Sequence, residues 1–224
     1  MKSALLIGAA PIARIDSYRA ALMSCELFVA IDGGLEIFRE LGVRPQILIG
    51  DLDSVDRESL DWVQHSDTEV IPLPVAKDVS DLDAALELAR DRRWGPLTVG
   101  GILGGRPDHT LAAMGSLARS SALDIRFIGD TEDGFVLDET HHPSLSLEDI
   151  GLHVSLIAPL GTAVVTLEGF RFPLREGALQ TLTSLGLSNV STAVGATITV
   201  HTGRILVFVS SAINTERRGL PTSA

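Results

Sequence analysis

The sequence predicts an α/β domain with a parallel sheet, followed by an all-β domain. Up to residue 132, short apolar runs alternate with longer amphipathic ones, which is typical of strands covered by helices. From residue 133 the apolar runs are short and β-branched, and Gly, Pro, Ser or Asn separates them. We therefore predict an α/β domain over 1–132 and a β domain over 133–213, with a polar, disordered tail over 214–224.

In the first domain, each predicted strand is a short, mostly apolar run. These runs are Ala4–Ile7, Leu27–Ile31, Ile47–Ile49, Glu69–Leu73, Leu97–Ile102 and Ile125–Ile128. Between them, apolar residues recur three and four positions apart, as in Leu82, Ala85, Leu86 and Ala89, which predicts an amphipathic helix. Strands that alternate with helices form a parallel sheet with helices on both faces.

The second domain shows no comparable helical pattern. Its predicted strands are Val154–Ile157, Ala163–Leu167, Thr197–Val200 and Ile205–Val209. Short β-branched runs between turn residues indicate an all-β fold.

The composition excludes several classes of partner. The chain of 224 residues has 45% hydrophobic and 21% charged residues, and its formal net charge is −11. An acidic balance argues against nucleic acid and against an anionic membrane surface as partners. The chain has a single cysteine, Cys25, and lacks an apolar run of the roughly 20 residues that a membrane-spanning helix needs, so we expect a cytoplasmic protein.

Four polar clusters each follow a predicted strand of the first domain. They are Asp32-Gly33-Gly34, Gly50-Asp51-Leu52-Asp53-Ser54, Lys77-Asp78-Val79-Ser80-Asp81 and Gly104-Gly105-Arg106-Pro107-Asp108-His109. Because the carboxyl ends of parallel strands lie at one edge of a sheet, these clusters should converge where open α/β sheets bind ligands.

The residue types in these clusters favour phosphate chemistry with a metal ion. Six aspartates should crowd into one cleft: Asp32, Asp51, Asp53, Asp78, Asp81 and Asp108. Carboxylates at such close range require cations between them, and hard oxygen ligands favour Mg²⁺. Lys77 and Arg106 suit phosphate oxygens, and the glycines, including Gly33 and Gly105, allow a backbone to approach a phosphate closely. Together these groups supply what phosphoryl transfer requires.

Each cluster also has an ordinary structural interpretation. Ser80 and Asp83 have the spacing of a capping box at the start of a helix. Pro107 suits the first residue of a helix, and His109 suits a hydrogen-bonding role at that helix start. It is the expected convergence of all four clusters that favours a site.

The motifs resemble those of the thiamine pyrophosphokinase family, in the family's order. The segments that carry the resemblance are Asp32-Gly33-Gly34, Gly50-Asp51-Leu52-Asp53-Ser54, Asp78-x-Ser80-Asp81-Leu82, Gly104-Gly105-Arg106-x-Asp108-His109-Thr110 and, more weakly, Ser188-Asn189. The resemblance implies an α/β domain with a C-terminal β-sandwich, and a homodimer with thiamine bound in a cleft between subunits. It also implies that the hydroxyl of thiamine attacks the β-phosphorus of ATP and releases AMP.

Residue roles follow from the resemblance position by position. Asp51, Asp53 and Asp81 would organise Mg²⁺ and the phosphates, and Arg106 and Asp108 would position ATP or the attacking hydroxyl. We expect the phosphates of ATP to be bound by a larger set: Asp32, Gly33, Lys77, Asp78, Gly105, Arg106 and His109.

The acceptor should bind to the β domain, because the predicted strand edge of the first domain offers no apolar lining for an organic ring. Phe172, Ser188 and Asn189 are the candidate contacts. The alternative for Ser188-Asn189 is a simple turn between strands.

Two other functions fit part of the pattern. Asp51-x-Asp53 after an apolar run matches the nucleophile motif of haloacid-dehalogenase-like phosphatases, which leaves Gly104–His109 and the β domain without a role. A nucleotide- or thiamine-sensing module without turnover would not need so many carboxylates.

Overall fold

The computed structural model describes residues 1–211, which belong to two compact units. The first comprises Met1–Ser116 and Leu123–Asp130, and the second comprises Leu117–Ala122 and the chain from Thr131 onward. The tail predicted over 214–224 lies outside the described residues.

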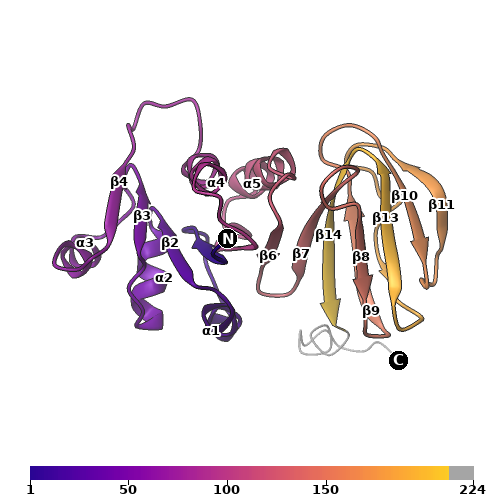
Figure 1. The fold of residues 1–224 in the computed structure, drawn as a ribbon, viewed down its shortest axis with the longest axis horizontal. Helices are drawn as coiled ribbons and strands as arrows, with labels where there is room; N and C mark the ends of the chain where they lie inside the picture. Colours follow the sequence, from indigo (N-terminus) through magenta and orange to yellow (C-terminus); the bar gives the residue numbers. More distant parts are fainter. Residues whose placement is uncertain (212–224) are drawn as a thin grey trace. The chain divides into compact units, whose positions relative to one another are not determined.

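The first unit alternates strands with helices, as predicted (Figure 1). Its strands are β1 (Ala4–Ile7), β2 (Leu27–Ile31), β3 (Ile47–Gly50), β4 (Glu69–Pro72), β5 (Leu97–Gly100) and β6 (Ile125–Ile128). Its helices are α1 (Ile15–Ser24), α2 (Gly34–Leu41), α3 (Arg57–Gln64), α4 (Asp81–Asp91) and α5 (Pro107–Arg119), whose last residues belong to the second unit. The strands pair in parallel in the order β6-β5-β1-β2-β3-β4.

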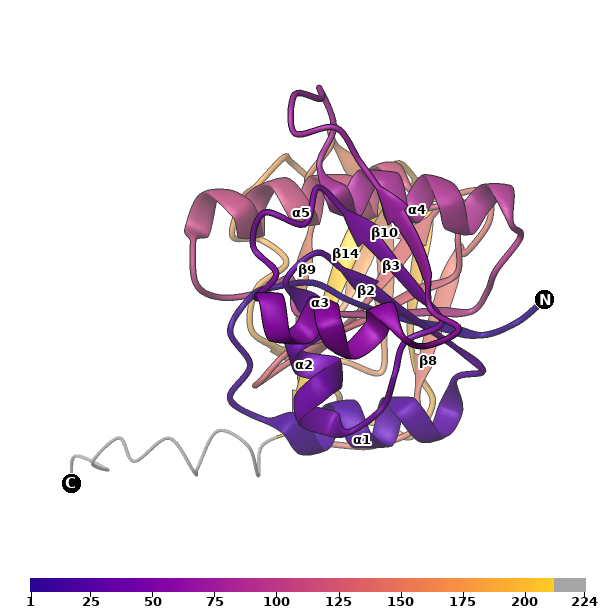
Figure 2. The same cartoon turned by 90° about the vertical axis from the view of Figure 1, so that its left-hand side faces the viewer.

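The strand order explains how the helices cover the sheet. From β1 to β4 the chain adds strands in one direction, and it then returns to the other side of β1 to form β5 and β6. Because crossovers between parallel strands are right-handed, this reversal places α1, α2 and α3 on one face and α4 and α5 on the other. Figure 2 shows the two groups of helices on opposite sides of the strands. The reversal makes the carboxyl edge beside β1 a topological switch point, where such sheets bind ligands.

A tight contact fixes α2 against the sheet. Leu5, Ile7 and Phe38 are fully buried in the core beneath α1, α2 and α3. A Cβ at Gly34, the first residue of α2, would lie 1.9 Å from the carbonyl oxygen of Ile7. Only glycine can therefore start α2 at this position.

Several predicted boundaries are confirmed, and two strands are shorter than predicted, β4 by one residue and β5 by two. β1, β2 and β6 have the predicted bounds, and the predicted helix around Leu82–Ala89 is α4. β5 ends at Gly100 instead of Ile102, because Gly101 adopts a left-handed φ of 63° and its Cα approaches the backbone of Gly8.

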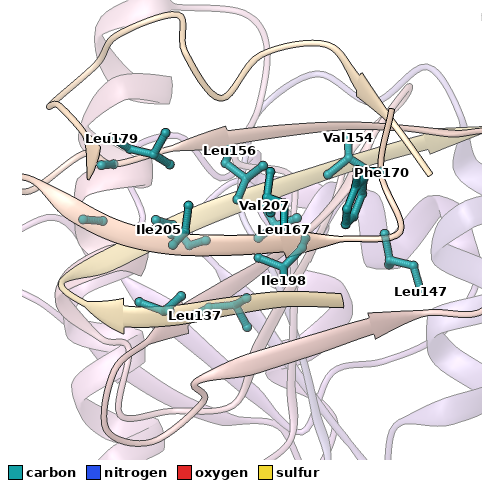
Figure 3. Close-up of a cluster of buried hydrophobic side chains, with 14 of the residues drawn as sticks. Leu137, Leu147, Val154, Leu156, Leu167, Phe170, Leu179, Ile198, Ile205 and Val207 are labelled. Atoms are coloured by element: carbon teal, nitrogen blue, oxygen red, sulfur yellow. The ribbon is translucent and has the colours of Figure 1, made fainter. Parts of the chain in front are cut away.

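The second unit contains two antiparallel sheets. Its strands are β7 (Asp133–Asp138), β8 (Ser144–Leu147), β9 (Leu152–Ile157), β10 (Ala163–Glu168), β11 (Leu174–Leu179), β12 (Asn189–Val190), β13 (Ala196–Thr202) and β14 (Arg204–Ser211). They pair in the orders β12-β9-β14-β7 and β11-β10-β13-β8. Both sheets contribute to one apolar core, in which Leu156 and Val207 of the first meet Leu167 and Ile198 of the second (Figure 3).

Four strands of this unit were not predicted, and their sequences explain why. β8 alternates Ser with Leu, β11 carries Arg175 and Glu176, and β12 has two residues. β7 begins at Asp133-Gly134, which resembles a turn. Among the described residues, every helix is too short or too polar to cross a membrane.

Candidate active site

The predicted clusters follow the carboxyl ends of parallel strands, and the register brings two of them into contact. Ile31 of β2 pairs with Ile49 of β3, so the residues that follow these strands are neighbours. Asp32 donates its backbone N–H to the carbonyl oxygen of Ile49 at 2.9 Å, and Asp51 directly follows β3. Strand register therefore sets the distance between the first two aspartates.

Asp32 is held in an unusual conformation. Its φ of 49° lies in the left-handed region, and the residue is only 8% exposed. A Cβ at Gly50 would lie 2.9 Å from the Cβ of Asp32, so a side chain at position 50 would displace it. Within the described part of the chain, Oδ1 of Asp32 is buried and accepts no hydrogen bond. A buried carboxylate oxygen without a partner is costly and indicates an external ligand.

Asp32 forms a cluster with two more carboxylates. One oxygen from each of Asp32, Asp51 and Asp53 lies within 4.8 Å of the others, and we call this group the acidic cluster. Asp51 Oδ1 accepts the backbone N–H of Asp53 at 3.4 Å, and Asp53 Oδ1 accepts the hydroxyl of Ser54 at 3.0 Å. Three converging carboxylates offer hard oxygen donors that fit a divalent cation such as Mg²⁺.

Lys77 lies beside the acidic cluster, in the loop between β4 and α4 that Figure 1 shows extending beyond the sheet. Its Nζ donates to Asp51 Oδ2 at 2.9 Å and lies 3.2 Å from Asp81 Oδ1, in an approach that fails the geometry of a hydrogen bond. The side chains of Lys77, Asp51 and Asp81 are 14%, 12% and 23% exposed. An ammonium therefore links two carboxylates in a largely covered position.

These contacts change the acidities of the three groups. The hydrogen bond from Lys77 lowers the pKa of Asp51, and the same bond raises the pKa of Lys77. Burial raises the pKa of Asp81, although Lys77 opposes this shift. Asp51 and Lys77 are therefore charged at neutral pH, which suits a site for metal and phosphate.

The start of α4 places Asp81 in this group. Ser80 is the N-cap, its hydroxyl accepts the backbone N–H of Asp83, and the Asp83 carboxylate accepts the N–H of Ser80. The predicted capping box is thus confirmed. It fixes Asp81 as the first helical residue, with its carboxylate directed at Lys77.

The cluster after β5 forms an ion pair of its own. The guanidinium of Arg106 donates from Nε to Asp108 Oδ1 at 3.2 Å and from Nη2 to Oδ2 at 2.5 Å. The hydrogen bonds from Arg106 lower the pKa of Asp108 to about 2. Both side chains are well exposed, and Pro107 is the first residue of α5 as predicted. His109 and Asp78 are exposed as well.

Sequence reasoning missed the loop after β1. A Cβ at Gly33 would lie 3.0 Å from the Cβ of Ala9, and one at Gly105 would lie 3.0 Å from Cδ of Pro11, so this loop borders two predicted phosphate-binding glycines. Asp130, which follows β6, holds the loop by accepting the backbone N–H groups of residues 13 and 14. Both segments follow parallel strands, so the rule that identified the other clusters could have included them.

The candidate acceptor contacts belong to the second unit. The side chain of Asn189 is buried and is bound within the protein: its Oδ1 accepts the backbone N–H of Phe172 at 3.0 Å, and its Nδ2 donates to the carbonyl oxygen of Phe172 at 2.7 Å. Phe172 is 60% exposed, with the Arg171 guanidinium carbon 5.6 Å from its ring centroid. Ser188 is exposed with a left-handed φ of 58°. Asn189 therefore fixes the backbone that presents Phe172.

Comparison with known proteins identifies one family. A family model described as "Thiamin pyrophosphokinase, catalytic domain" matches residues 18–128. A thiamine pyrophosphokinase of Bacillus subtilis (strain 168) is 24% identical over 166 residues, which cover 73% of this chain and 77% of that protein. Thiamine pyrophosphokinase 1 of Arabidopsis thaliana is 33% identical over 143 residues, which cover 58% of this chain and 52% of that protein.

Solved structures show the same fold. The crystal structure of a thiamine pyrophosphokinase from Bacillus subtilis superposes with a TM-score of 0.79 at 22% identity, covering 94% of this chain and 100% of that one. The thiamin pyrophosphokinase of Candida albicans gives a TM-score of 0.76 at 14% identity, covering 93% and 90%.

Proposed function

Because the chain belongs to the thiamine pyrophosphokinase family, we propose that it transfers the terminal diphosphate of ATP to the hydroxyl of thiamine, giving thiamine diphosphate and AMP. The hydroxyl oxygen bonds to the β-phosphorus, and the bond from that phosphorus to the α–β bridging oxygen breaks. The bridging oxygen leaves with AMP, and the hydroxyl proton is released.

The observation that carries this proposal is the acidic cluster with Lys77 beside it. Asp32, Asp51 and Asp53 would hold Mg²⁺, since their oxygens lie within 4.8 Å of one another and the buried Oδ1 of Asp32 has no other partner. The bound metal would neutralise charge on the phosphate oxygens. Asp81, predicted from the resemblance as a third ligand, contacts Lys77, and its role on the metal stays a prediction.

The remaining predicted contacts divide between the two substrates. Lys77 and Arg106 would bind phosphate oxygens, with Asp108 orienting the guanidinium through their two hydrogen bonds. The other predicted ATP contacts, Gly33, Asp78, Gly105 and His109, remain part of the proposal. So does the cytoplasmic location that the single cysteine favours.

The acceptor would bind at the second unit of a partner subunit in a homodimer. Phe172 offers an exposed aromatic ring, Ser188 an exposed hydroxyl, and Asn189 the support of the Phe172 backbone. Mixing Asp51→Asn protein with Phe172→Ala protein tests the shared site. Activity is assayed with the acceptor far below its KM, where Phe172→Ala protein should be about tenfold less active than wild type. If each site uses both subunits, half of the dimers are mixed and each mixed dimer has one intact site, so activity should recover to about one quarter of wild type. No recovery after verified subunit exchange would contradict the arrangement.

The reaction is tested with purified protein, ATP, Mg²⁺ and a panel of alcohols that includes thiamine. AMP and diphosphorylated product should appear one for one, and only with the correct alcohol. ADP as the sole nucleotide product would refute diphosphate transfer. The family assignment gives no support to the phosphatase or to the sensing module, which predict phosphate release without ATP and ligand binding without AMP.

A further inference from the structure

Lys77 occupies a position that matters for metal binding as well as for phosphate. Its ammonium contacts Asp51, a member of the acidic cluster, at 2.9 Å and Asp81 at 3.2 Å. These carboxylates come from different elements, the loop after β3 and the first turn of α4. With 14% exposure, the Lys77 side chain is not a solvated surface group that moves freely.

The contacts of Asp51 show that the Lys77 ammonium occupies a carboxylate oxygen that could otherwise bind a metal. Oδ2 of Asp51 accepts the hydrogen bond from Lys77, and Oδ1 accepts the backbone N–H of Asp53. Oδ1 of Asp32, in contrast, is buried and has no partner within the described residues. Among the described residues, the acidic cluster therefore has one buried oxygen without a partner, while Asp51 is already paired with a cation of the protein.

We propose that Lys77 is a built-in counter-cation that keeps the affinity of the acidic cluster for free divalent metal low, so that tight metal binding depends on nucleotide. The ammonium competes with the metal for Asp51 and repels a second positive charge at short range. Phosphate oxygens of a nucleotide offer the ammonium other acceptors and add negative charge for the metal. This deepens the proposed function, since it assigns the order in which metal and nucleotide become tightly bound.

The first test measures metal binding without nucleotide and without turnover. Mn²⁺ is titrated by calorimetry into wild type, Lys77→Met and Lys77→Gln. Removing the ammonium should tighten Mn²⁺ binding by about tenfold or more in both variants. The glutamine variant keeps a neutral hydrogen-bond donor near Asp81, so it tests the proposal even if the methionine variant does not fold.

The chain offers a matched control, because Lys2 is its only other lysine and is exposed. Lys2→Met removes the same charge from another part of the first unit and should leave the Mn²⁺ affinity within about twofold. A general effect of net charge would instead move both variants alike, and that result would overturn the proposal.

The second test repeats the titration with a non-hydrolysable ATP analogue. In wild type the analogue should tighten Mn²⁺ binding strongly, and this gain should shrink about tenfold in the Lys77 variants, because binding couplings are reciprocal. Equal or weaker Mn²⁺ binding by the folded Lys77 variants without nucleotide would overturn the proposal. If wild type forms no AMP from ATP, the proposed function fails, while the titration without nucleotide still decides the role of Lys77.

Discussion

Asp32→Asn should raise the stability of the metal-free protein and lower its activity, because it removes a buried negative charge that destabilises the protein when no metal is bound. The residue is 8% exposed, Oδ1 has no partner, and two other carboxylates have oxygens within 4.8 Å. Asparagine has nearly the same shape, and its amide can donate hydrogen bonds to those carboxylate oxygens. The substitution therefore replaces repulsion between carboxylates by hydrogen bonds from the amide, and it leaves no cavity in place of the side chain.

The magnitude follows from the distance. At the 4.8 Å limit of the cluster, two unit charges repel by about 1 kcal/mol at the dielectric constant of water, and by more in a less polar site. In a protein of this size about 1 kcal/mol corresponds to roughly 2–4 °C in melting temperature. Asp32→Asn should therefore raise the melting temperature in excess chelator by about that amount. Diphosphate transfer should fall about 100-fold or more, equivalent to roughly 2.7 kcal/mol of transition-state stabilisation.

Thermal melts with chelator and with saturating Mn²⁺, together with an AMP-release assay, measure both effects. Wild type should gain stability from the metal, and the variant should lose most of that gain. Asp16→Asn is the matched control, since its carboxylate is 92% exposed on α1, and it should change neither quantity measurably. A variant that melts lower in chelator and keeps its metal response would refute the placement of Asp32 in a metal site.

Three further predictions test other contacts. Gly34→Ala should lower the melting temperature by about 10 °C or leave the protein insoluble, because its Cβ would lie 1.9 Å from a backbone oxygen; circular dichroism measures this. The hydrogen bonds from Arg106 lower the pKa of Asp108 from its ordinary value of 3.8 to about 2, so the ion pair persists above pH 3.8 and is lost as the pH falls through 2. Arg106→Ala should return this pKa toward 3.8 in a carboxyl NMR titration, and an unchanged pKa would contradict the pairing. Asn189→Ala should both lower the melting temperature and raise the KM of the acceptor about tenfold, whereas Phe172→Ala should raise that KM alone; unchanged KM in both would remove Phe172 from the acceptor site.

The periodicity of apolar residues was enough to predict which segments of the chain form the site. Apolar runs locate the strands of the first unit, and parallel pairing then places the residues that follow them at one edge. This reasoning correctly grouped Asp51 with Asp53 and placed Lys77 and Asp81 nearby. It needed no knowledge of side-chain conformation.

The rest depends on register and on backbone conformation, which no local pattern reveals. Asp32 was expected among the six aspartates of one cleft and was assigned to phosphate. Its left-handed φ and the pairing of Ile31 with Ile49 bring its carboxylate into the acidic cluster. Similarly, Asn189 was predicted to contact the acceptor, and the structure shows its amide bound to the backbone of Phe172. For Asp32 the neighbouring aspartates were predicted and the backbone conformation was not. For Asn189 the partner was not predicted, because Phe172 lies in the segment between β10 and β11, far from Asn189 in the sequence.

Two of the helices that start at the predicted edge, α4 and α5, offer a phosphate little positive charge. A helix N-terminus commonly binds phosphate through free backbone N–H groups and its positive dipole end. In α4 the capping box fills such donors, and Asp81 and Asp83 add negative charge to the first turn. In α5 the first residue, Pro107, has no N–H, and Asp108 again places a carboxylate in the first turn. Neither of these two helix starts is therefore well placed to neutralise a phosphate, whereas α2 starts at Gly34 and its N-cap, Gly33, has no side-chain cap. Lys77, Arg106 and a divalent metal would supply most of the positive charge, so replacing Lys77 should alter metal and nucleotide binding together.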